Sequence, residues 1–376
     1  MAPIRDSVLK DSSGVRHLKD PTVTVVVATY NRPDTLRVAI GSVVRQTVQD
    51  WKLLVIGDAC DERTASAMRD FSDDPRVCYV NLDRRCGGQA LPNSAGMRLA
   101  QSEYVALLNH DDIWLQDHLE VALERLDAAG ADLFVGRAAF AVELQQSMAG
   151  GLRPHFVGTS PSHRTLREAF GKSYMLFEPA SSWVIQRELA ERVGAWRSAT
   201  ELYRLSIQDW LLRAWRAGAV LAESQRITCL KLESDWGGSA HVRLYDAPAD
   251  GHEWVAAMLD IGGPDEVRAL LADDVEHSSV EQRWFLDKSL IAGRGMRRAL
   301  DMALQIPFLA DLYRRTGIDA YSLLCRALGV SKGRLWRMVL ARRTGEQIAE
   351  LPTLEEVVTF VEASLARDPN WRSQRG

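Results

Sequence analysis

Three groups of polar residues come directly after short apolar runs in the first third of the chain. They are Thr29-Tyr30-Asn31, Asp58, and His110-Asp111-Asp112. Together they offer aromatic, amide, imidazole and carboxylate groups. Carboxylate oxygens can also join a divalent cation to phosphate oxygens, because hard cations prefer both kinds of ligand. We therefore expect a site for a polar, phosphorylated ligand.

Strands and helices must bring these groups together. Apolar runs at residues 23–28, 53–56, 77–82 and 104–108 alternate with amphipathic stretches, a pattern typical of a parallel sheet covered by helices. Pro33 begins the first of these helices. In open α/β sheets, ligands bind outside the carboxyl ends of the strands. The polar groups should therefore meet at one rim of the sheet.

Phosphate-binding glycine loops are absent from the sequence. Neither GxGxxG nor GxxxxGK[ST] occurs, so a glycine cradle alone would not hold a phosphate. A divalent cation held by Asp oxygens is the expected substitute.

Four motifs in this order resemble the family-2 inverting glycosyltransferases of GT-A fold. They are ATYNRP (28–33), VIGDACDERT (55–64), the long segment from GGQALPNSAG to NHDDIWLQDHLE (87–120) and SIQDWLLRAWRAGA (206–219). The resemblance covers roughly residues 21–245. It implies an α/β fold, a Rossmann-like and mainly parallel sheet with flanking helices, followed by an all-helical C-terminal region.

The resemblance also implies a nucleotide-sugar donor and the residues that bind it. The first motif would hold the base and ribose, and Asp58 would contact the base, although Gly57 replaces the preceding Asp of the family pattern. The residues implied for donor binding are Thr29, Tyr30, Asn31, Asp58, Arg85, Asn93, His110, Asp111, Lys231 and Arg243.

The acidic motif departs most from the family. Many relatives have four aspartates where this chain reads Asn109-His110-Asp111-Asp112. Asp111 aligns with the carboxylate that binds Mn²⁺ or Mg²⁺, His110 with a position that contacts ribose, and His241 is a candidate further metal ligand. An alternative interpretation of Asp111-Asp112 is a helix N-cap ahead of residues 113–125.

Inversion at a sugar carbon needs a base that removes the acceptor proton. By the resemblance this base is Asp209, with Gln208 where relatives have Glu. The alternative is an ordinary carboxylate in the first turn of a helix. Trp183 and Trp210 are the candidate acceptor-binding residues, since aromatic faces stack on sugars, although most of the tryptophans are expected in the core.

Composition restricts the classes of protein. The formal charge is −4, and no apolar run approaches the roughly 18 residues of a membrane helix. The N-terminus has no apolar core typical of a secretory signal, and the five cysteines contain no CxxC pair. We expect a cytoplasmic protein without a membrane span.

Four regions are expected along the chain: a flexible N-terminus (1–20), a nucleotide-sugar-binding half (21–135), an acceptor-binding and catalytic half (136–262) and a helical C-terminal domain (263–376). In the last region, Thr353 and Glu356 form a capping box ahead of an amphipathic helix. Residues 321–343 resemble a helix-turn-helix with a turn at Gly329. We favour a helical hairpin that packs on the transferase, dimerises it or holds an acceptor, because the acidic chain lacks the charge balance of a DNA binder.

The sequence thus predicts a metal-assisted, inverting glycosyltransferase, a hexosyltransferase of polysaccharide or glycoconjugate biosynthesis that favours a UDP-sugar. Its acceptor is an unidentified glycan, lipid-linked sugar, peptide or small molecule. One alternative is a catalytically weak or inactive transferase-like protein that binds nucleic acid or acts as a scaffold through its helical C-terminus. Another is a nucleotidyltransferase, which would need a glycine-rich, basic first loop that ATYNRP does not provide.

Overall fold

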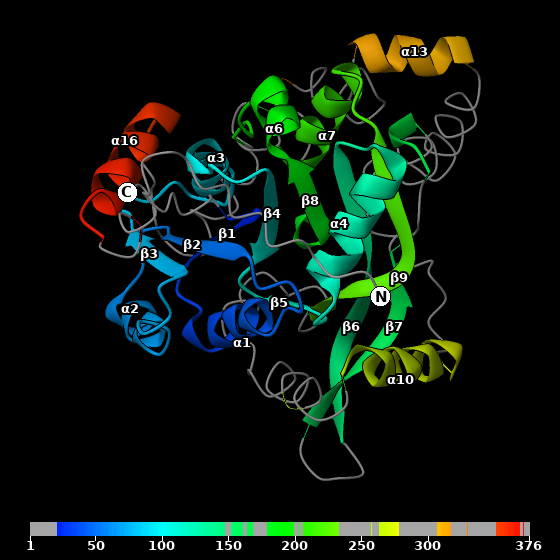
Figure 1. Cartoon of the computed structure of the whole chain (residues 1–376), viewed down its shortest axis with the longest axis horizontal. Coiled ribbons are helices and arrows are strands. Elements are labelled where there is room, and N and C mark those ends of the chain that lie inside the picture. Colours follow the sequence, from blue (N-terminus) through cyan, green and yellow to red (C-terminus); the bar gives the residue numbers. More distant parts are fainter. Residues whose placement is uncertain are drawn as a thin grey trace, which may run out of the picture.

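The computed structural model describes most of the first 232 residues and three later helices (Figure 1). The described residues are 21–146, 152–160, 164–167, 179–198, 206–232, 263–277, 307–316 and 351–368, with the single positions 202, 257, 329 and 371.

A parallel four-stranded sheet forms the first half of the fold. The order is β3 (Val77–Asn81), β2 (Trp51–Gly57), β1 (Val23–Thr29), β4 (Tyr104–Asn109), and each neighbouring pair is parallel. These are the four strands predicted from the apolar runs, each within a few residues of its expected bounds. The chain moves from β1 to β2 and β3 on one side and returns to β4 on the other.

The sheet continues beyond β4 with mixed pairing. The next strands are β8 (Trp183–Gln186), β6 (Leu133–Gln146), β9 (Leu221–Leu232) and β5 (Asp112–Trp114), and β7 (Leu152–Thr159) pairs with β6. Only β6 and β9 are parallel in this part. The predicted α/β class is confirmed, and its mainly parallel character belongs to the first half.

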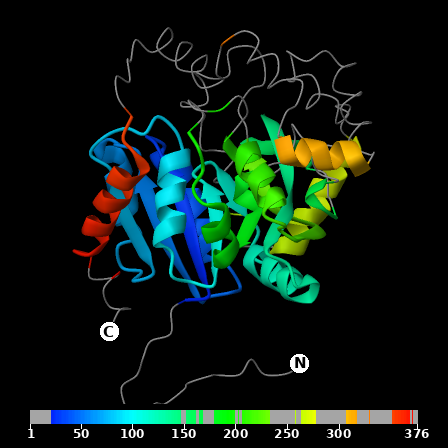
Figure 2. The ribbon, with the colours of Figure 1, turned by 90° about the horizontal axis from the view of Figure 1, so that it is seen from above.

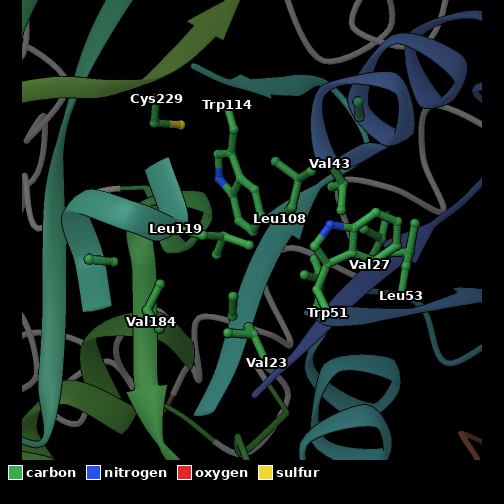
Figure 3. Packing of buried hydrophobic residues seen from close by; sticks show 14 of the residues in the cluster. Val23, Val27, Val43, Trp51, Leu53, Leu108, Trp114, Leu119, Val184 and Cys229 are labelled. Atoms are coloured by element: carbon green, nitrogen blue, oxygen red, sulfur yellow. The ribbon is translucent and has the colours of Figure 1, made fainter. Parts of the chain in front are cut away.

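Helices cover both faces of the sheet (Figures 1 and 2). Because side chains alternate along a strand, β1 sends Val25 and Val27 to one face and Val26 to the other. The first face packs against α1 and α4, around Trp51 and Trp114 (Figure 3). The second face packs against α3, α6 and α7. The bounds are α1 (Pro33–Val44), α2 (Glu62–Arg69), α3 (Ala90–Leu99), α4 (His118–Ala129), α6 (Arg187–Val193) and α7 (Ser206–Arg216).

Two C-terminal helices pack against the sheet, one in the cluster of β2 and β3 and the other in the cluster that includes β7. The capping box of Thr353 and Glu356 begins α16 (Leu354–Leu365), as predicted. Its apolar face packs with β2, β3 and α3, and Figure 2 shows it along that side of the sheet. The helix α10 (Pro264–His277) buries Val267 and Leu271 in the cluster that holds Phe156 of β7. These contacts join the two helices to the cores on either side of the sheet, while the predicted domain boundaries remain predictions.

Other predictions for the C-terminal region fall on undescribed residues. Of the proposed helix-turn-helix at 321–343, only Gly329 is described, with φ +62°. A third helix, α13 (Pro307–Thr316), lies beside α7.

Within the part of the chain that the structure describes, no helix combines the length and apolarity needed to cross a membrane.

Gly96 allows α3 to approach β1 closely. A Cβ at this position would lie 2.3 Å from Cγ1 of Val26, closer than real contacts permit. We expect Gly96→Ala to lower the free energy of unfolding by about 1–3 kcal/mol through overpacking. Urea unfolding would measure the loss. Gly88→Ala is the matched control, because its Cβ meets nothing within 4 Å; equal losses in both variants would contradict the packing argument.

His118 should make the fold sensitive to acid. Its ring is fully buried, lies 4.3 Å from the Trp114 ring between centroids, and has Nδ1 3.0 Å from Oγ1 of Thr228. Burial lowers its pKa from 6.5 to about 3. Below pH 6.5 the unfolded state therefore binds a proton that the folded state does not, and stability is lost as the pH falls.

From that pKa difference, His118 should lower the free energy of unfolding by about 2 kcal/mol between pH 7 and pH 5. In His118→Phe, which keeps a ring against Trp114 but cannot titrate, we expect the loss over this interval to be smaller by that amount. Urea unfolding at the two pH values measures both proteins. An identical loss in the two would show that His118 does not titrate in this way.

Candidate functional site

A pocket of about 320 Å³ opens where β1 and β4 end. In the parallel register Thr29 lies opposite Gly57, and Ala28 lies opposite Asn109, so three loops begin at the same edge. This is the point where the chain reverses its direction across the sheet, the usual ligand site of open α/β folds. The described lining residues are Ala28, Thr29, Tyr30, Arg32, Asp58, Arg85, Gly87, Gly88, Gln89, Pro92, Asn109, His110, Asp111 and Lys231.

Tyr30 joins two sides of this pocket. The guanidinium carbon of Arg85 lies 3.9 Å from the centre of the Tyr30 ring, a cation–π contact. The backbone N–H of Tyr30 donates to Nδ1 of His110 at 3.4 Å. Since Nδ1 accepts this bond, a neutral His110 ring carries its proton on Nε2. The contact thus fixes the tautomer of a ring on the pocket wall.

Asp58 closes the loop that carries Arg85. Its two carboxylate oxygens accept the backbone N–H groups of Cys86 and Gly87, the latter at 3.1 Å. Burial raises the pKa of Asp58, against the lowering effect of the Cys86 N–H and of the Arg85 guanidinium. The carboxylate therefore shapes the pocket wall and adds a negative charge to it.

Asp111 lies at the pocket wall in an ion pair. Its Oδ2 accepts a hydrogen bond from Nη1 of Arg32 at 3.0 Å. The Asp111 side chain is 21% exposed and the Arg32 side chain 8%. Arg32 was not among the residues assigned from the sequence. Its position in ATYNRP, directly after Asn31, was the available signal.

Asp112 lies behind the pocket rather than on it. It is fully buried, and it accepts the Ser181 hydroxyl and Nδ2 of Asn109, the latter at 2.8 Å. Lys231, which lines the pocket, places Nζ 3.6 Å from Oδ1 of Asp112. Burial raises the pKa of Asp112 to about 6, although Lys231 opposes this. Asp112 thus anchors Lys231 and the end of β4.

The helix N-cap interpretation of Asp111-Asp112 is wrong. Asp112 begins the short strand β5, paired with Lys231 of β9, and α4 begins only at His118. Residues 112–114 form a strand that pairs with β9, whereas that interpretation places residues 113 and 114 in a helix.

Asp209 is held apart from the pocket lining. It lies in the first turn of α7, 6% exposed, and Oδ2 accepts Nε of Arg213 at 2.8 Å. The same guanidinium donates to the carbonyls of Val193 and Ala195, at 2.6 and 2.7 Å. Arg197 also lies 3.7 Å from Oδ1. These arginines fix the orientation of the carboxylate next to α6.

The two predicted asparagines lie away from the described pocket lining. Asn31 takes a left-handed conformation with φ +47°, and its Oδ1 accepts the N–H of Asp61, which caps α2. Asn93 is buried in α3. Neither lies among the described lining residues.

The predicted acceptor contacts of Trp183 and Trp210 need correction. Both side chains are 0% exposed and lie in the core cluster between the sheet and α7. Their ring centroids are 5.7 Å apart. They fill this core, and neither offers a ring face for stacking on an acceptor. His241 and Arg243 lie outside the described residues.

Gly57 explains one departure from the family pattern. A Cβ here would lie 2.6 Å from Oδ1 of Asn81 and 2.9 Å from the Tyr79 hydroxyl. Asn81 in turn bonds the backbone of Cys60 in both directions, at 2.8 and 2.9 Å. The space of the missing side chain is filled by this packing, so of these two positions only Asp58 supplies a carboxylate.

For a divalent cation, the described residues contribute little beyond Asp111. Among them, no group of three His, Cys, Asp or Glu side chains is arranged to hold a metal ion. Asp111 fits as a single protein ligand at the pocket wall, where oxygens of a bound diphosphate and water could complete the six positions that Mg²⁺ prefers.

The fold and this pocket define an α/β protein with a ligand site at the carboxyl ends of its central strands. Residues 24–194 match the family model of glycosyl transferase family 2, and this part of the chain, which holds most of the pocket, belongs to that family. The predicted family and GT-A class are thereby confirmed.

Individual relatives cover shorter stretches. Succinoglycan biosynthesis protein ExoO of Rhizobium meliloti (strain 1021) is 38% identical over 117 residues, which are 31% of this chain and 33% of that protein. The Escherichia coli UDP-Glc:alpha-D-GlcNAc-diphosphoundecaprenol beta-1,3-glucosyltransferase WfgD is 29% identical over 109 residues, 29% of this chain and 42% of that protein. The crystal structure of S. aureus TarS has a TM-score of 0.48 at 14% identity, over 87% of this chain and 56% of that chain. The chain therefore spans less than half the length of these two curated relatives.

Asp58 should be essential for the shape of the pocket. In Asp58→Asn the amide nitrogen would face a backbone N–H of Cys86 or Gly87, leaving a buried donor without an acceptor. We expect a loss of about 1–3 kcal/mol in the free energy of unfolding and nucleotide affinity reduced at least about tenfold. Calorimetric titration with UDP and urea unfolding measure the two effects. Asp83→Asn, an exposed change in the same loop, should alter neither.

Proposed function

We propose that this protein transfers a hexose from a nucleoside diphosphate sugar, with a UDP-sugar favoured, to an acceptor hydroxyl with inversion at the sugar carbon. The observation that carries the proposal is the set of side chains around the pocket. Three cationic residues, Arg32, Arg85 and Lys231, line it together with the Tyr30 ring and the Asp58 carboxylate. Cations suit a diphosphate, while an aromatic ring and a carboxylate suit a base and ribose.

The names of relatives support the kind of product. ExoO is named for succinoglycan biosynthesis, and WfgD is named for transfer from UDP-Glc to a diphosphoundecaprenol-linked sugar. A third relative, from Bacillus subtilis, is named a putative teichuronic acid biosynthesis glycosyltransferase. We therefore propose a role in polysaccharide or glycoconjugate biosynthesis, with a glycan or lipid-linked sugar as acceptor. We also propose that the reaction takes place in the cytoplasm, where the enzyme would find nucleotide sugars.

In the proposed reaction, Asp209 removes the proton of the acceptor hydroxyl. Its carboxylate is buried and oriented by Arg213, which favours one fixed direction of approach. The acceptor oxygen attacks the anomeric carbon while the bond to the nucleoside diphosphate breaks, and Arg85 and Lys231 stabilise the negative charge of the leaving group.

Asp111 is the residue that would hold Mn²⁺ or Mg²⁺ in this proposal. Bound there, the ion would act as a Lewis acid toward the diphosphate. In the same proposal His110, with its proton on Nε2, donates a hydrogen bond to a ribose hydroxyl.

Donor identity can be tested by thermal shift. UDP-, GDP-, CMP- and dTDP-sugars, each with and without Mn²⁺, should separate clearly, because a ligand that binds only the folded state raises its apparent stability. We expect the largest shift from a UDP-sugar with Mn²⁺. The accepted donor is then used to measure donor hydrolysis and, with candidate acceptors, transfer.

Two variants test the assigned roles. Asp209→Asn should keep nucleotide affinity but lower turnover about 100- to 10,000-fold, as expected for loss of a general base. Asp111→Asn should weaken binding of the metal and of the metal–donor complex. Asp127→Asn, an exposed change on α4, should leave both unchanged. Undiminished hydrolysis and transfer in both active-site variants would rule out the proposed mechanism.

A further inference from the structure

Arg32 is placed where the donor diphosphate and a metal ion would both act. It is the N-cap residue of α1, and its carbonyl accepts the N–H of Leu36 at 3.0 Å, so its backbone is held by the helix. Its side chain is only 8% exposed, yet it reaches the pocket lining. At its end, Nη1 donates to Oδ2 of Asp111 at 3.0 Å.

This contact conflicts with the metal-binding role of Asp111. A divalent cation that binds the Asp111 carboxylate meets the positive guanidinium already bonded to one of its oxygens. Removing the carboxylate from a nearly buried arginine is also costly, because breaking one side of such a pair leaves a charge poorly compensated. A metal ion alone therefore competes with Arg32 for Asp111.

A nucleoside diphosphate changes this competition. It brings negative oxygens into a pocket that Arg32 already lines, and arginine pairs well with phosphate oxygens. The guanidinium can then exchange a carboxylate partner for a phosphate partner, and Asp111 becomes available to the cation.

On the basis of the proposed function, we infer that Arg32 is an exchangeable counter-ion of Asp111 that couples metal binding to donor binding. With the pocket empty it holds Asp111, and with the donor bound it moves to the diphosphate while Asp111 takes the metal. The coupling is reciprocal, so the nucleotide tightens metal binding by the same factor by which the metal tightens nucleotide binding. A purely structural ion pair would stabilise the fold without producing this coupling.

The test measures binding and not turnover. The Kd of Mn²⁺ alone, of UDP and GDP alone, and of Mn²⁺ with each nucleotide are determined by calorimetry and by the electron paramagnetic resonance signal of free Mn²⁺. The proteins are wild type, Arg32→Gln, Asp111→Asn and the double variant. Arg37→Gln is the matched control, since Arg37 lies on the same helix in ion pairs with Asp34 and Asp70, 39% exposed and outside the pocket lining.

We expect Arg32→Gln to bind Mn²⁺ alone roughly tenfold more tightly than wild type, within the usual 5- to 150-fold range of coupling between sites. UDP or GDP alone should bind more weakly, and the factor by which nucleotide tightens Mn²⁺ binding should fall. Asp111→Asn should lose Mn²⁺ binding with and without the Arg32 change. Arg37→Gln should match wild type throughout.

If Arg32→Gln binds Mn²⁺ with an unchanged or higher Kd and binds UDP normally, the inference is overturned and the proposed function stands. Persistent Mn²⁺ binding in Asp111→Asn would also overturn it. Failure of both UDP and GDP to bind wild type would instead contradict the proposed function. Should Arg32→Gln not fold, Arg32→Lys retains the charge but is too short to keep the same contact. It should bind Mn²⁺ roughly threefold more tightly than wild type, and an unchanged Kd there overturns the inference.

Discussion

The register of the central strand β1 determines where everything else in the site lies. Because β1 is parallel to both β2 and β4, with Thr29 opposite Gly57 and Ala28 opposite Asn109, three loops leave the sheet at one edge. Two helical layers hold this strand from either face, and α3 approaches it closely enough to require a glycine at position 96. A shift of one residue in β1 would exchange its two faces and move Tyr30 and Arg32 away from Asp111.

Charge within the pocket is balanced by short-range pairs. Asp58 is satisfied by two backbone N–H groups, Asp111 is paired with Arg32, and Lys231 is held near the buried Asp112. Each negative group thus has a defined partner before any ligand arrives. A diphosphate that enters adds negative charge to a lining that contains three cationic side chains, so the described site is better matched to an anion than to an isolated metal ion.

Much of the parallel half of the sheet and its pocket could be predicted from the sequence, because local patterns determine it. The apolar runs end within one residue of the strand ends. Seven of the residues assigned to donor binding from the motifs line one pocket: Thr29, Tyr30, Asp58, Arg85, His110, Asp111 and Lys231. The misses depend on contacts between distant parts of the chain. Asp112 lies in a strand because it pairs with β9. Trp183 and Trp210 are buried because they pack in the core. The ion pair of Arg32 with Asp111 connects two motifs that the sequence analysis considered separately.

The position of α16 affects the order in which the chain can fold during synthesis. Leu54 and Ile56 of β2 share a buried cluster with Val357, Val361 and Leu365, about three hundred residues later in the sequence. One face of β2 and β3, close to Asp58, stays partly uncovered until α16 has left the ribosome. Contacts of such long sequence separation form slowly and leave apolar surface exposed in the meantime. The half of the fold that carries most of the pocket is therefore made first, but its core is among the last to be completed.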